Sequence, residues 1–291
     1  MPDNYALDDR WLAVCAETLS CRISKKEFSF AGNGTAVLNY SVLLSPLFGR
    51  RLVSLPFSDE SGILFPAGEP GRPEKAALVK MLGAFLDKEA AGLKLGYAEL
   101  RGADALSDEL EQAGFIKTSP YCRFVLDLKP GYAACRASFG TNILKNLSKA
   151  GKHLTIRSPQ RCSPEELSAI YAIYLRQMKK FGSPPLPRTY FAAMIRENIY
   201  RPFLAEAGGR IAAFLLAIRR GRTFYTDLNA SLDEYDALFP KVALFNETIE
   251  YACQSGFERY DMMRTRRGGG VYEHKRKWGG SEVPIKYYYK L

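Results

Sequence analysis

Apolar and polar residues follow one another in blocks along the first 130 residues, and these blocks predict strands and helices in turn. Residues 36–45 and 51–57 have the pattern of strands, and Pro56 is expected to end the second one. Apolar residues at helical spacing predict a helix over residues 74–90, and alternation predicts a strand over 93–100. This order of elements indicates an α/β protein.

A short helix and a strand complete this first region. The helix "DELEQA" is expected to end at Gly114, because glycine adopts the left-handed conformation of a helix C-cap without strain. The strand that follows has three apolar residues on one face, namely Phe124, Leu126 and Leu128. The pair Pro130-Gly131 then marks a boundary between two regions.

The second region opens with helices. The segment "TNILKNLSKAGKH" predicts a short helix with Thr141 as its N-cap and Gly151 at its end. The segment "SPEE" (163–166) has the pattern of a capping box with proline at the first helical position, which predicts a longer helix behind it. The proline-rich segment 181–188 must interrupt any helix.

Strands and one further helix complete the second region. Glycines separate three apolar segments, 202–207, 210–220 and 222–231, and this predicts successive hairpins. Residues 241–256 predict an amphipathic helix that ends at Gly256, after which the chain is expected to enter the sheet again.

Two segments of the chain are similar to each other. Both "LEQAGFIKT" and "ACQSGFERY" predict a helix, a glycine, a phenylalanine and a strand. Their glycines, Gly114 and Gly256, lie 142 residues apart, which is close to half the chain. This spacing favours two copies of one α/β fold over a chance match.

The composition is that of an ordinary soluble globular protein. The 291 residues are 47% hydrophobic and 25% charged, and no run of 18 apolar residues predicts a membrane-spanning helix. The first ten residues carry three aspartates and no apolar run, so no secretory signal is expected. The length fits two domains, residues 1–130 and 131–291, in a protein that we expect in the cytoplasm.

The cysteine and histidine content argues against a metal site. The six cysteines form no C-x-x-C pair, and the chain has only two histidines, so the ligand spacings of a zinc site are missing. Reduced and mostly buried thiols are the simplest interpretation for a cytoplasmic protein.

The net charge of +10 is concentrated in the second domain. Residues 1–130 contain 15 basic and 17 acidic residues, whereas residues 131–291 contain 26 and 14. A positive field of this kind favours anionic partners such as a phosphate, a nucleotide, tRNA or an anionic membrane surface. The alternative is that the lysines and arginines merely solvate the surface.

The densest chemistry lies in residues 260–291. Six basic residues and one acid, Glu273, fall between Arg264 and Lys277, and three consecutive glycines at 268–270 lie within this stretch. Glycine lets backbone N–H groups approach an anion closely, and arginine binds a phosphate or a carboxylate through two hydrogen bonds. The alternative is a glycine-rich surface loop with solvated charges that leads to an edge strand.

The same segment resembles the C-terminal signature of the FemAB-like proteins, a group within the GNAT acyltransferase superfamily. That signature runs approximately as Phe-Asp-Phe-Gly-Arg-Ser, a glycine-rich turn, Tyr-x-Phe-Lys, Trp-Gly and a final Pro…Tyr strand. The residues on its positions are Asp261, Arg264, Thr265, Gly270, Tyr272, Lys275, Trp278, Gly279, Pro284 and Tyr287. The chain departs from the signature at Met262-Met263, which replace Phe-Gly, and at His274, which replaces an aromatic residue.

The resemblance covers most of the chain, because segments 54–65, 141–156 and 181–191 are similar to other parts of these proteins. It implies two tandem GNAT-like domains, each a mixed sheet flanked by helices, and transfer of an acyl or aminoacyl group to an amine. Relatives that build peptidoglycan cross-bridges take the amino acid from aminoacyl-tRNA, whereas others use acyl-CoA. A third set, associated with exopolysaccharide or exosortase loci, is most similar to this chain and implies an amine-bearing envelope or polysaccharide precursor as acceptor.

The segment before the helix at 241–256 bears on the acyl donor, which would be a co-substrate and not a permanently bound cofactor. Acetyl-CoA enzymes of the superfamily bind pyrophosphate at a helix N-terminus through the motif Arg/Gln-x-x-Gly-x-Gly/Ala. Here the stretch "SLDEYDALFPKVAL" has no glycine, carries three acids, and loses an N–H donor at Pro240. Aminoacyl-tRNA or a carrier-bound donor is therefore favoured, and acetyl-CoA is the alternative.

The expected mechanism needs no covalent enzyme intermediate, because an amine attacks an activated ester or thioester directly. By its match to the motif, Lys275 is expected to stabilise the developing negative charge, and Arg264 to hold a phosphate or carboxylate. Asp261 would orient Arg264 or accept a proton. His274 is a candidate base because imidazole titrates near neutral pH, and a buried replacement for phenylalanine is its alternative role. The aromatic residues with stacking faces are Tyr272 and Trp278.

Two further sets of residues are candidates for substrate binding. Tyr225, Asp227 and Asn229 alternate along the central strand and are expected to share a face, which either lines the substrate cleft or contacts solvent. Lys145 and Lys149 lie four residues apart on one helix face and either bind phosphate or are solvated.

Two other classes of function fit the same residues. A catalytically silent GNAT pair would use the basic second domain to bind RNA or polysaccharide, and it is favoured if Asp261, Arg264 and Lys275 do not converge on one cleft. A peripheral protein at the inner membrane face would be drawn to anionic lipid, and it predicts that basic residues of 266–267 and 275–277 lie on one flat exposed face.

Overall fold

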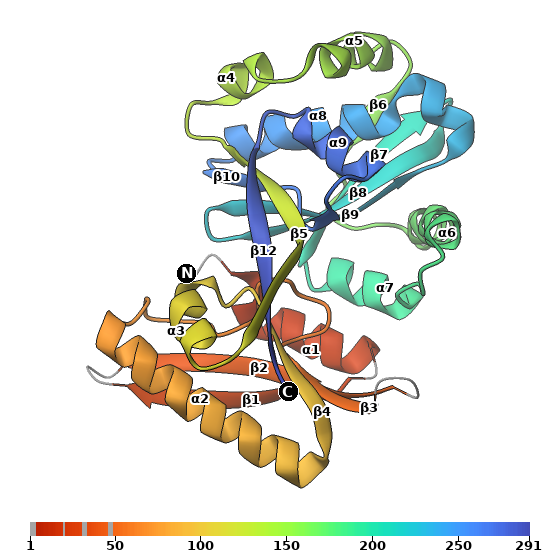
Figure 1. The fold of residues 1–291 in the computed structure, drawn as a ribbon. Helices are drawn as coiled ribbons and strands as arrows, with labels where there is room; N and C mark the ends of the chain where they lie inside the picture. Colours follow the sequence, from red (N-terminus) through yellow and green to blue (C-terminus); the bar gives the residue numbers. More distant parts are fainter. Residues whose placement is uncertain (1–3, 20, 31–33, 46–48) are drawn as a thin grey trace.

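The computed structural model describes residues 4–19, 21–30, 34–45 and 49–291 (Figure 1). Twelve strands among these residues form one mixed sheet in the order β1-β2-β3-β4-β12-β5-β10-β9-β8-β7-β6, and β11 pairs with β5 beside this path. Helices pack on both faces of the sheet in the second half of the chain. The predicted α/β class is confirmed.

In the first half, the described residues form five strands and five helical segments. The strands are β1 (Ser24–Phe30), β2 (Gly34–Ser45), β3 (Gly49–Val53), β4 (Leu95–Arg101) and β5 (Ile116–Asp127). The helical segments are η1 (Tyr5–Leu7), α1 (Asp9–Thr18), α2 (Arg72–Leu93), η2 (Asp104–Leu106) and α3 (Ser107–Gln112). The strand predicted over 51–57 ends earlier, at Val53, because the backbone turns at Leu55, where φ is +43°.

The second half, to which we count the C-terminal strand, contains the remaining elements. Its strands are β6 (Thr155–Arg157), β7 (Tyr200–Ala207), β8 (Arg210–Arg220), β9 (Thr223–Ser231), β10 (Arg259–Asp261), β11 (Thr265–Arg266) and β12 (Ser281–Lys290). Its helices are α4 (Tyr132–Ala137), α5 (Thr141–Ala150), α6 (Pro164–Phe181), α7 (Arg188–Arg196), η3 (Asp233–Leu238), α8 (Pro240–Gln254) and α9 (Gly270–Arg276).

Helix starts were predicted with mixed success. The capping box of α6 is confirmed, because the Ser163 hydroxyl accepts the N–H of Glu166 at 3.2 Å and the Glu166 carboxylate accepts the N–H of Ser163 at 2.8 Å. The prediction for α5 was wrong by one residue: Thr141 is its first helical residue, and Gly140 is the N-cap. The Gly140 N–H is bound by the Lys277 carbonyl at 2.8 Å, which fixes the chain before the helix begins.

The two similar segments of the sequence have the same structure. Gly114 and Gly256 follow α3 and α8 with φ of +81° and +78°, and in each case the glycine N–H and the next N–H bind carbonyls of the last helical turns at 3.0–3.1 Å. The surrounding topology also repeats. In each half, two antiparallel strands are followed by a helix and a parallel strand, as β2-β3-α2-β4 and as β8-β9-α8-β10.

The last strand of each half pairs with the other half. β12 pairs with β4, β5 pairs with β10, and β5 and β12 pair antiparallel with each other across the middle of the molecule (Figure 1). The C-terminal strand therefore lies inside the sheet. The alternative interpretation, which expected an edge strand at the C-terminus, was wrong on this point. The division between residues 130 and 131 stays a prediction, since the sheet is continuous across it.

Three clusters of buried apolar side chains hold the layers together. One lies between the first strands and α2 and α3. The other two lie on opposite faces of the second half: α1, α6 and α7 cover one face, and α4, α5 and α8 cover the other. Alternation along β9 sends Phe224 to the α8 side and Tyr225 to the α1 side. Helix α1 of the first half thus completes a core of the second.

The cysteines and the helix lengths complete this description. Four of the six cysteines are buried, which confirms that these side chains are mostly buried. Within the described ranges, no helix combines the length and the apolar character that crossing a bilayer requires.

Candidate functional site

A cleft of about 680 Å³ lies between the two halves, on the face of the sheet that α8 does not cover. Strands β5, β9, β10 and β12 form one wall, and the loops that follow β3 and β4 form another. The charged residues that line the cleft are Asp59, Glu60, Glu69, Asp104 and Asp261, together with Arg123 and Arg259. The cleft is therefore acidic, although the chain carries a net charge of +10.

Strand register explains why these side chains meet. Asp261 on β10 lies opposite Tyr225 on β9 and Val125 on β5, and paired residues of neighbouring strands point to the same face. Arg123 precedes Val125 by two residues and shares that face. Tyr225, Asp261 and Arg123 therefore reach the cleft from three adjacent strands.

Arg123 joins acids from both halves. Its guanidinium lies 3.3 Å from the Asp261 carboxylate and forms an ion pair with Glu60 of the loop after β3. Asp261 is 3% exposed and accepts the N–H of Met263 at 2.7 Å. Burial raises the pKa of Asp261, and the charge of Arg123 opposes that rise.

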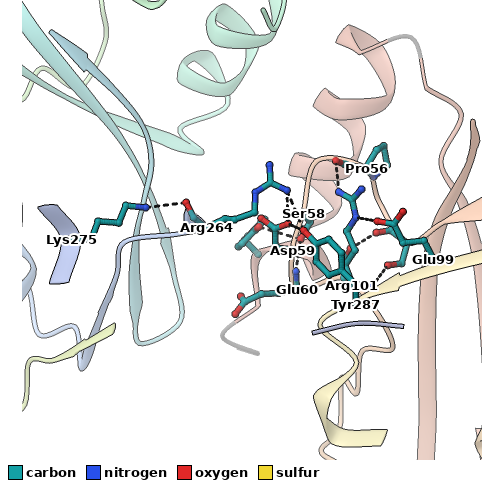
Figure 2. Close-up of polar contacts among 12 residues, drawn as sticks. Pro56, Ser58, Asp59, Glu60, Glu99, Arg101, Arg264, Lys275 and Tyr287 are labelled. Atoms are coloured by element: carbon teal, nitrogen blue, oxygen red, sulfur yellow. Dashed lines mark hydrogen bonds and ion pairs between the residues drawn. The ribbon is translucent and has the colours of Figure 1, made fainter. Parts of the chain in front are cut away.

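Arg264 binds a carboxylate, but it is one of the protein's own. Its guanidinium donates to Asp59 at 3.1 Å (Figure 2). The same guanidinium stacks on the Tyr121 ring at 4.9 Å. The Tyr287 hydroxyl donates to the same Asp59 oxygen at 2.6 Å. Arg264 thus clamps the loop of the first half against the second half.

Lys275 is buried and points at the backbone. Its ammonium donates to the carbonyls of Met262 at 2.5 Å and of Met263 and Arg264 at 3.0 Å, so three acceptors match its three donors. Figure 2 shows the bond to the Arg264 carbonyl. Desolvation lowers its pKa to about 8. Asp261 lines the cleft, whereas Arg264 and Lys275 do not, so the three motif residues do not converge on one cleft.

A β-bulge in β9 changes which residues face the cleft. β10 pairs with β9 only as far as Tyr225, while β9 continues to Ser231. On its other edge, β9 pairs Thr226 with Ala217 but Leu228 with Leu216, so Asp227 is an extra residue. The bulge reverses the alternation: Leu228 packs in the same core as Tyr225, and Asn229 lies opposite Leu215 of the other core. The prediction that Tyr225, Asp227 and Asn229 share one face was therefore wrong.

Asp227 itself is held by a tyrosine. The Tyr200 hydroxyl on β7 donates a hydrogen bond to its carboxylate, which places that carboxylate on the Tyr225 side of the sheet. The residue keeps part of its surface accessible. Burial of the carboxylate nevertheless raises its pKa to about 6, with the Tyr200 hydrogen bond opposing the rise.

Comparisons with known proteins agree with this architecture. Residues 137–276 match the family model described as an acetyltransferase (GNAT) domain. The solved structure of FemX is similar over 99% of this chain and 92% of FemX, with 14% identity and a TM-score of 0.72. The chain has a FemX-like tandem GNAT fold.

Other solved structures share this GNAT fold. L-PGS from Bacillus licheniformis is 14% identical, with a TM-score of 0.63, over 97% of this chain and 91% of that protein. A tandem GNAT protein from the clavulanic acid biosynthesis pathway is 12% identical, with a TM-score of 0.54, over 98% and 96%. A search of curated proteins by sequence found no match.

Three predicted site residues of the C-terminal motif, Tyr272, His274 and Trp278, do not line the cleft. Trp278 is fully buried, with its ring 4.9 Å from that of Phe139, and its indole N–H donates to His274 at 3.4 Å. Burial lowers the pKa of His274 to about 4, so the imidazole is neutral at neutral pH. Tyr272 donates to Glu282 at 2.6 Å. This geometry matches the alternative, structural role of His274.

The helix N-terminus that binds pyrophosphate in acetyl-CoA enzymes has mixed charges here. The Lys149 ammonium lies over the ring of Phe239, the residue directly before α8, at 5.7 Å, and Lys145 is exposed. The nearby acids are engaged by α6: Lys180 pairs with Asp233, and Arg176 lies 3.6 Å from Glu234. Basic residues of α6 thus partly neutralise the acids of η3. The sequence around η3 gives no sign of this, because α6 lies more than 50 residues earlier in the chain.

Sequence reasoning missed Asp59, Glu60 and Arg123. These residues lie on a loop and a strand far from the C-terminal motif, and only the fold brings them to Asp261 and Arg264. One signal was available, because the segment 54–65 is similar to the first domain of FemAB-like proteins and contains Asp59 and Glu60. Among the described residues, no group of three or more His, Cys, Asp or Glu is placed to hold a metal ion.

Proposed function

We propose that the protein is an N-acyltransferase that moves an activated acyl or aminoacyl group to an amine held in the cleft between the two halves. The observation that carries this proposal is the charge of the cleft. Five acids and two arginines line it, a balance of −3 in a chain whose net charge is +10. Such a site attracts a protonated amine and disfavours an anionic acceptor group.

Carboxylates from both halves are available to this amine. Asp59 lines the cleft from the loop after β3, and Asp261 lines it from β10. Each already has a cationic partner, Arg264 for Asp59 and Arg123 for Asp261, and each retains oxygen lone pairs that an ammonium group can use.

The donor and the pathway belong to the same proposal. Aminoacyl-tRNA and acyl-CoA both carry phosphates. Negative phosphates suit the second half, because residues 131–291 contain 26 basic and 14 acidic residues. The names of two similar structures, FemX and L-PGS, support an amine-bearing envelope or polysaccharide precursor as acceptor.

One observation favours a catalytically silent module that binds RNA or polysaccharide instead. Lys275 is the motif residue expected to stabilise negative charge, but its ammonium donates its hydrogen bonds to three backbone carbonyls. Of the five basic residues that the membrane-surface alternative expects on one exposed face, Lys275 is buried, at 6% exposed, whereas Arg266, Arg267, Arg276 and Lys277 are exposed.

Amide formation tests the proposal directly. The full chain would be incubated with acetyl-CoA or with a mixture of aminoacyl-tRNAs and a panel of amines (lysine, a lysine-containing peptide, glucosamine and spermidine), and products would be identified by mass spectrometry. We expect an amide from one donor class, and we expect Asp59→Asn to raise the KM for the amine about tenfold with a smaller change in kcat.

The matched control is Asp87→Asn, which removes an exposed carboxylate of α2 that pairs with Lys290 and should leave both constants unchanged. Binding of a donor by the wild type without any amide product would support the silent module and overturn the proposal.

A further inference from the structure

The two carboxylate oxygens of Asp59, which lines the proposed acceptor site, have different surroundings. Arg264 donates to Oδ1 at 3.1 Å, and the Tyr287 hydroxyl donates to the same atom at 2.6 Å. Among the described residues no donor binds Oδ2, and the side chain keeps 15% of its surface exposed. Oδ2 is therefore the oxygen that remains for an ammonium group in the cleft, as long as the carboxylate keeps this orientation.

The loop that carries Asp59 has a strained backbone. Leu55 has φ of +43°, in the left-handed region that a bulky residue rarely adopts. Further along, the Ser61 hydroxyl donates to the Ser54 carbonyl at 2.6 Å, so the loop closes on itself. A strained conformation persists only where the surrounding structure holds it. The loop therefore needs support from other parts of the chain.

Arg101, the last residue of β4, supplies this support. Its Nη1 donates to the carbonyl of Pro56, directly after the strained Leu55, at 2.8 Å (Figure 2). Its backbone N–H donates to the Ser54 hydroxyl, directly before Leu55, also at 2.8 Å. Arg101 therefore binds the loop on both sides of the strained residue.

The same guanidinium contacts the tyrosine that holds Asp59. The Cζ atom of Arg101 lies over the ring of Tyr287, 5.3 Å from the ring centroid. Tyr121 also contacts this ring, with the two centroids 5.8 Å apart. These contacts fix the ring whose hydroxyl donates to Asp59. One arginine thus contacts both supports of Asp59, which are its loop and its hydrogen-bond donor.

The charge of Arg101 is balanced by a partner of its own. Its Nε donates to the Glu99 carboxylate at 2.6 Å, and the two side chains are 15% and 8% exposed. A buried ion pair contributes little to stability, because the cost of desolvation offsets the attraction. A guanidinium paired in this way holds its neighbours without adding a net positive charge beside an amine site.

From these contacts we infer that Arg101 is a positioning residue for the acceptor amine. It holds the loop at Pro56 and the ring of Tyr287, and through them it keeps Oδ2 of Asp59 available to the ammonium group. The inference rests on the proposed function and adds to it a residue that does not line the cleft. The alternative is a merely structural ion pair, which predicts a loss of stability without a change in the KM for the amine.

Arg101→Lys tests the inference while a positive charge remains beside Glu99. A lysine can pair with Glu99, but it has no planar group that donates to Pro56 and stacks on Tyr287 at the same time. Steady-state transfer would be measured with acetyl-CoA or aminoacyl-tRNA, whichever the wild type uses, and with the best amine of the panel. We expect the KM for the amine to rise about fivefold, with kcat and the KM for the donor changed by less than about twofold.

A double-mutant cycle with Asp59→Asn shows whether Arg101 acts through Asp59. If it does, Arg101→Lys should change the KM for the amine by less than about twofold once Asp59 has been replaced, because the two substitutions remove the same contact. Where Arg101→Lys does not fold, Glu99→Gln together with Arg101→Met carries the same test, since this pair of substitutions leaves no buried charge without a partner.

The matched control is Arg157→Lys. It makes the same change in an arginine of β6 that pairs with two carboxylates, those of Glu166 and Glu206, at the far end of the sheet. Because no contact joins this group to Asp59 or Tyr287, both constants for the amine should equal those of the wild type.

The outcomes distinguish this inference from the function on which it rests. An unchanged KM in Arg101→Lys, or an equal rise in KM with and without the Asp59 carboxylate, overturns the inference and leaves the proposed function standing. Absence of turnover in the wild type with both donor classes overturns both. Thermal unfolding of each variant is measured alongside, so that a lower stability with an unchanged KM identifies a merely structural ion pair.

Discussion

Lys275 connects the C-terminal motif to the strand that carries Asp261. Its side chain enters from α9 and binds the carbonyls of residues 262–264, the segment that leaves the sheet directly after Asp261. A lysine at this position therefore fixes the backbone beside the cleft. Its contribution to transfer, if the proposed function holds, includes the placement of Asp261 and Arg264.

Replacing Lys275 by methionine should reduce stability and transfer together. The substitution removes three charge-assisted hydrogen bonds and leaves partly buried carbonyls without a donor, for which we expect a loss of about 2–5 kcal/mol in the free energy of unfolding. Urea denaturation followed by fluorescence measures this loss. Lys277→Met is the control, because Lys277 is exposed. If the two variants were equally stable, Lys275 would not fix the backbone of residues 262–264.

His274 should make the protein sensitive to mild acid. Its pKa is lowered from 6.5 to about 4 by burial, so between these values the unfolded chain binds a proton that the folded protein does not. Stability is full above pH 6.5 and falls as the pH drops toward 4, by roughly 3 kcal/mol at most. His274→Phe should flatten this dependence in urea denaturation between pH 7 and 4.5. A slope equal to that of the wild type would show that another group is responsible.

The element that joins α9 to β12 depends on the glycine of the Trp-Gly pair. Gly279 has φ of +79°, and a Cβ there would lie 2.2 Å from the Ser138 hydroxyl oxygen and 2.8 Å from the Ser138 carbonyl oxygen. Gly279→Ala should therefore cost about 2–4 kcal/mol of unfolding free energy through strain and overlap. Chemical denaturation of the purified variant measures the cost.

Gly270 is the matched control for that substitution. It is the last of the three consecutive glycines at 268–270, its φ is not positive, and a Cβ there would meet nothing within 4 Å. Gly270→Ala should change stability by no more than about 0.5 kcal/mol. If both substitutions proved harmless, the close approach of Gly279 to Ser138 would not describe the protein in solution.

The elements show which structural features a sequence can predict. Local signals were sufficient for the capping box at Ser163, for the turns at Gly114 and Gly256 and for the strand bearing Phe124, because each depends on neighbouring residues. The bulge at Asp227 had no such signal. It arises where β9 must pair with β8 while it loses β10, and periodicity alone therefore placed Asn229 on the wrong face.

At the scale of the whole molecule, the candidate site depends on segments far apart in the chain. The C-terminal motif led to Asp261, and the apolar pattern of β9 led to Tyr225, both of which line the cleft. Asp59 and Glu60 could not be placed there from the sequence. Their partners Arg264 and Arg123 come close to them only because β5 pairs with β10 of the second half and β12 pairs with β4 of the first half. Long-range pairing therefore limits what local patterns predict.

The pairing of β5 and β12 with strands of the opposite half should make the two halves unfold as one unit. β5 and β12 each belong to the sheet of the opposite half, and α1 completes the core around Phe214, so neither half can open without exposing the core of the other. The only two tryptophans, Trp11 in α1 and Trp278 after α9, are buried in different cores and serve as local probes.

Single-tryptophan variants test this cooperativity. In Trp278→Phe the fluorescence reports on Trp11, and in Trp11→Phe it reports on Trp278, so each transition can be compared with the far-ultraviolet circular dichroism of the same variant. We expect fluorescence and circular dichroism to give one coincident urea transition in each variant, as for a two-state protein. A core-specific transition that precedes loss of secondary structure would mean that the halves are stable separately. Shared strands would then join two independent domains, and the cleft would be free to open without unfolding.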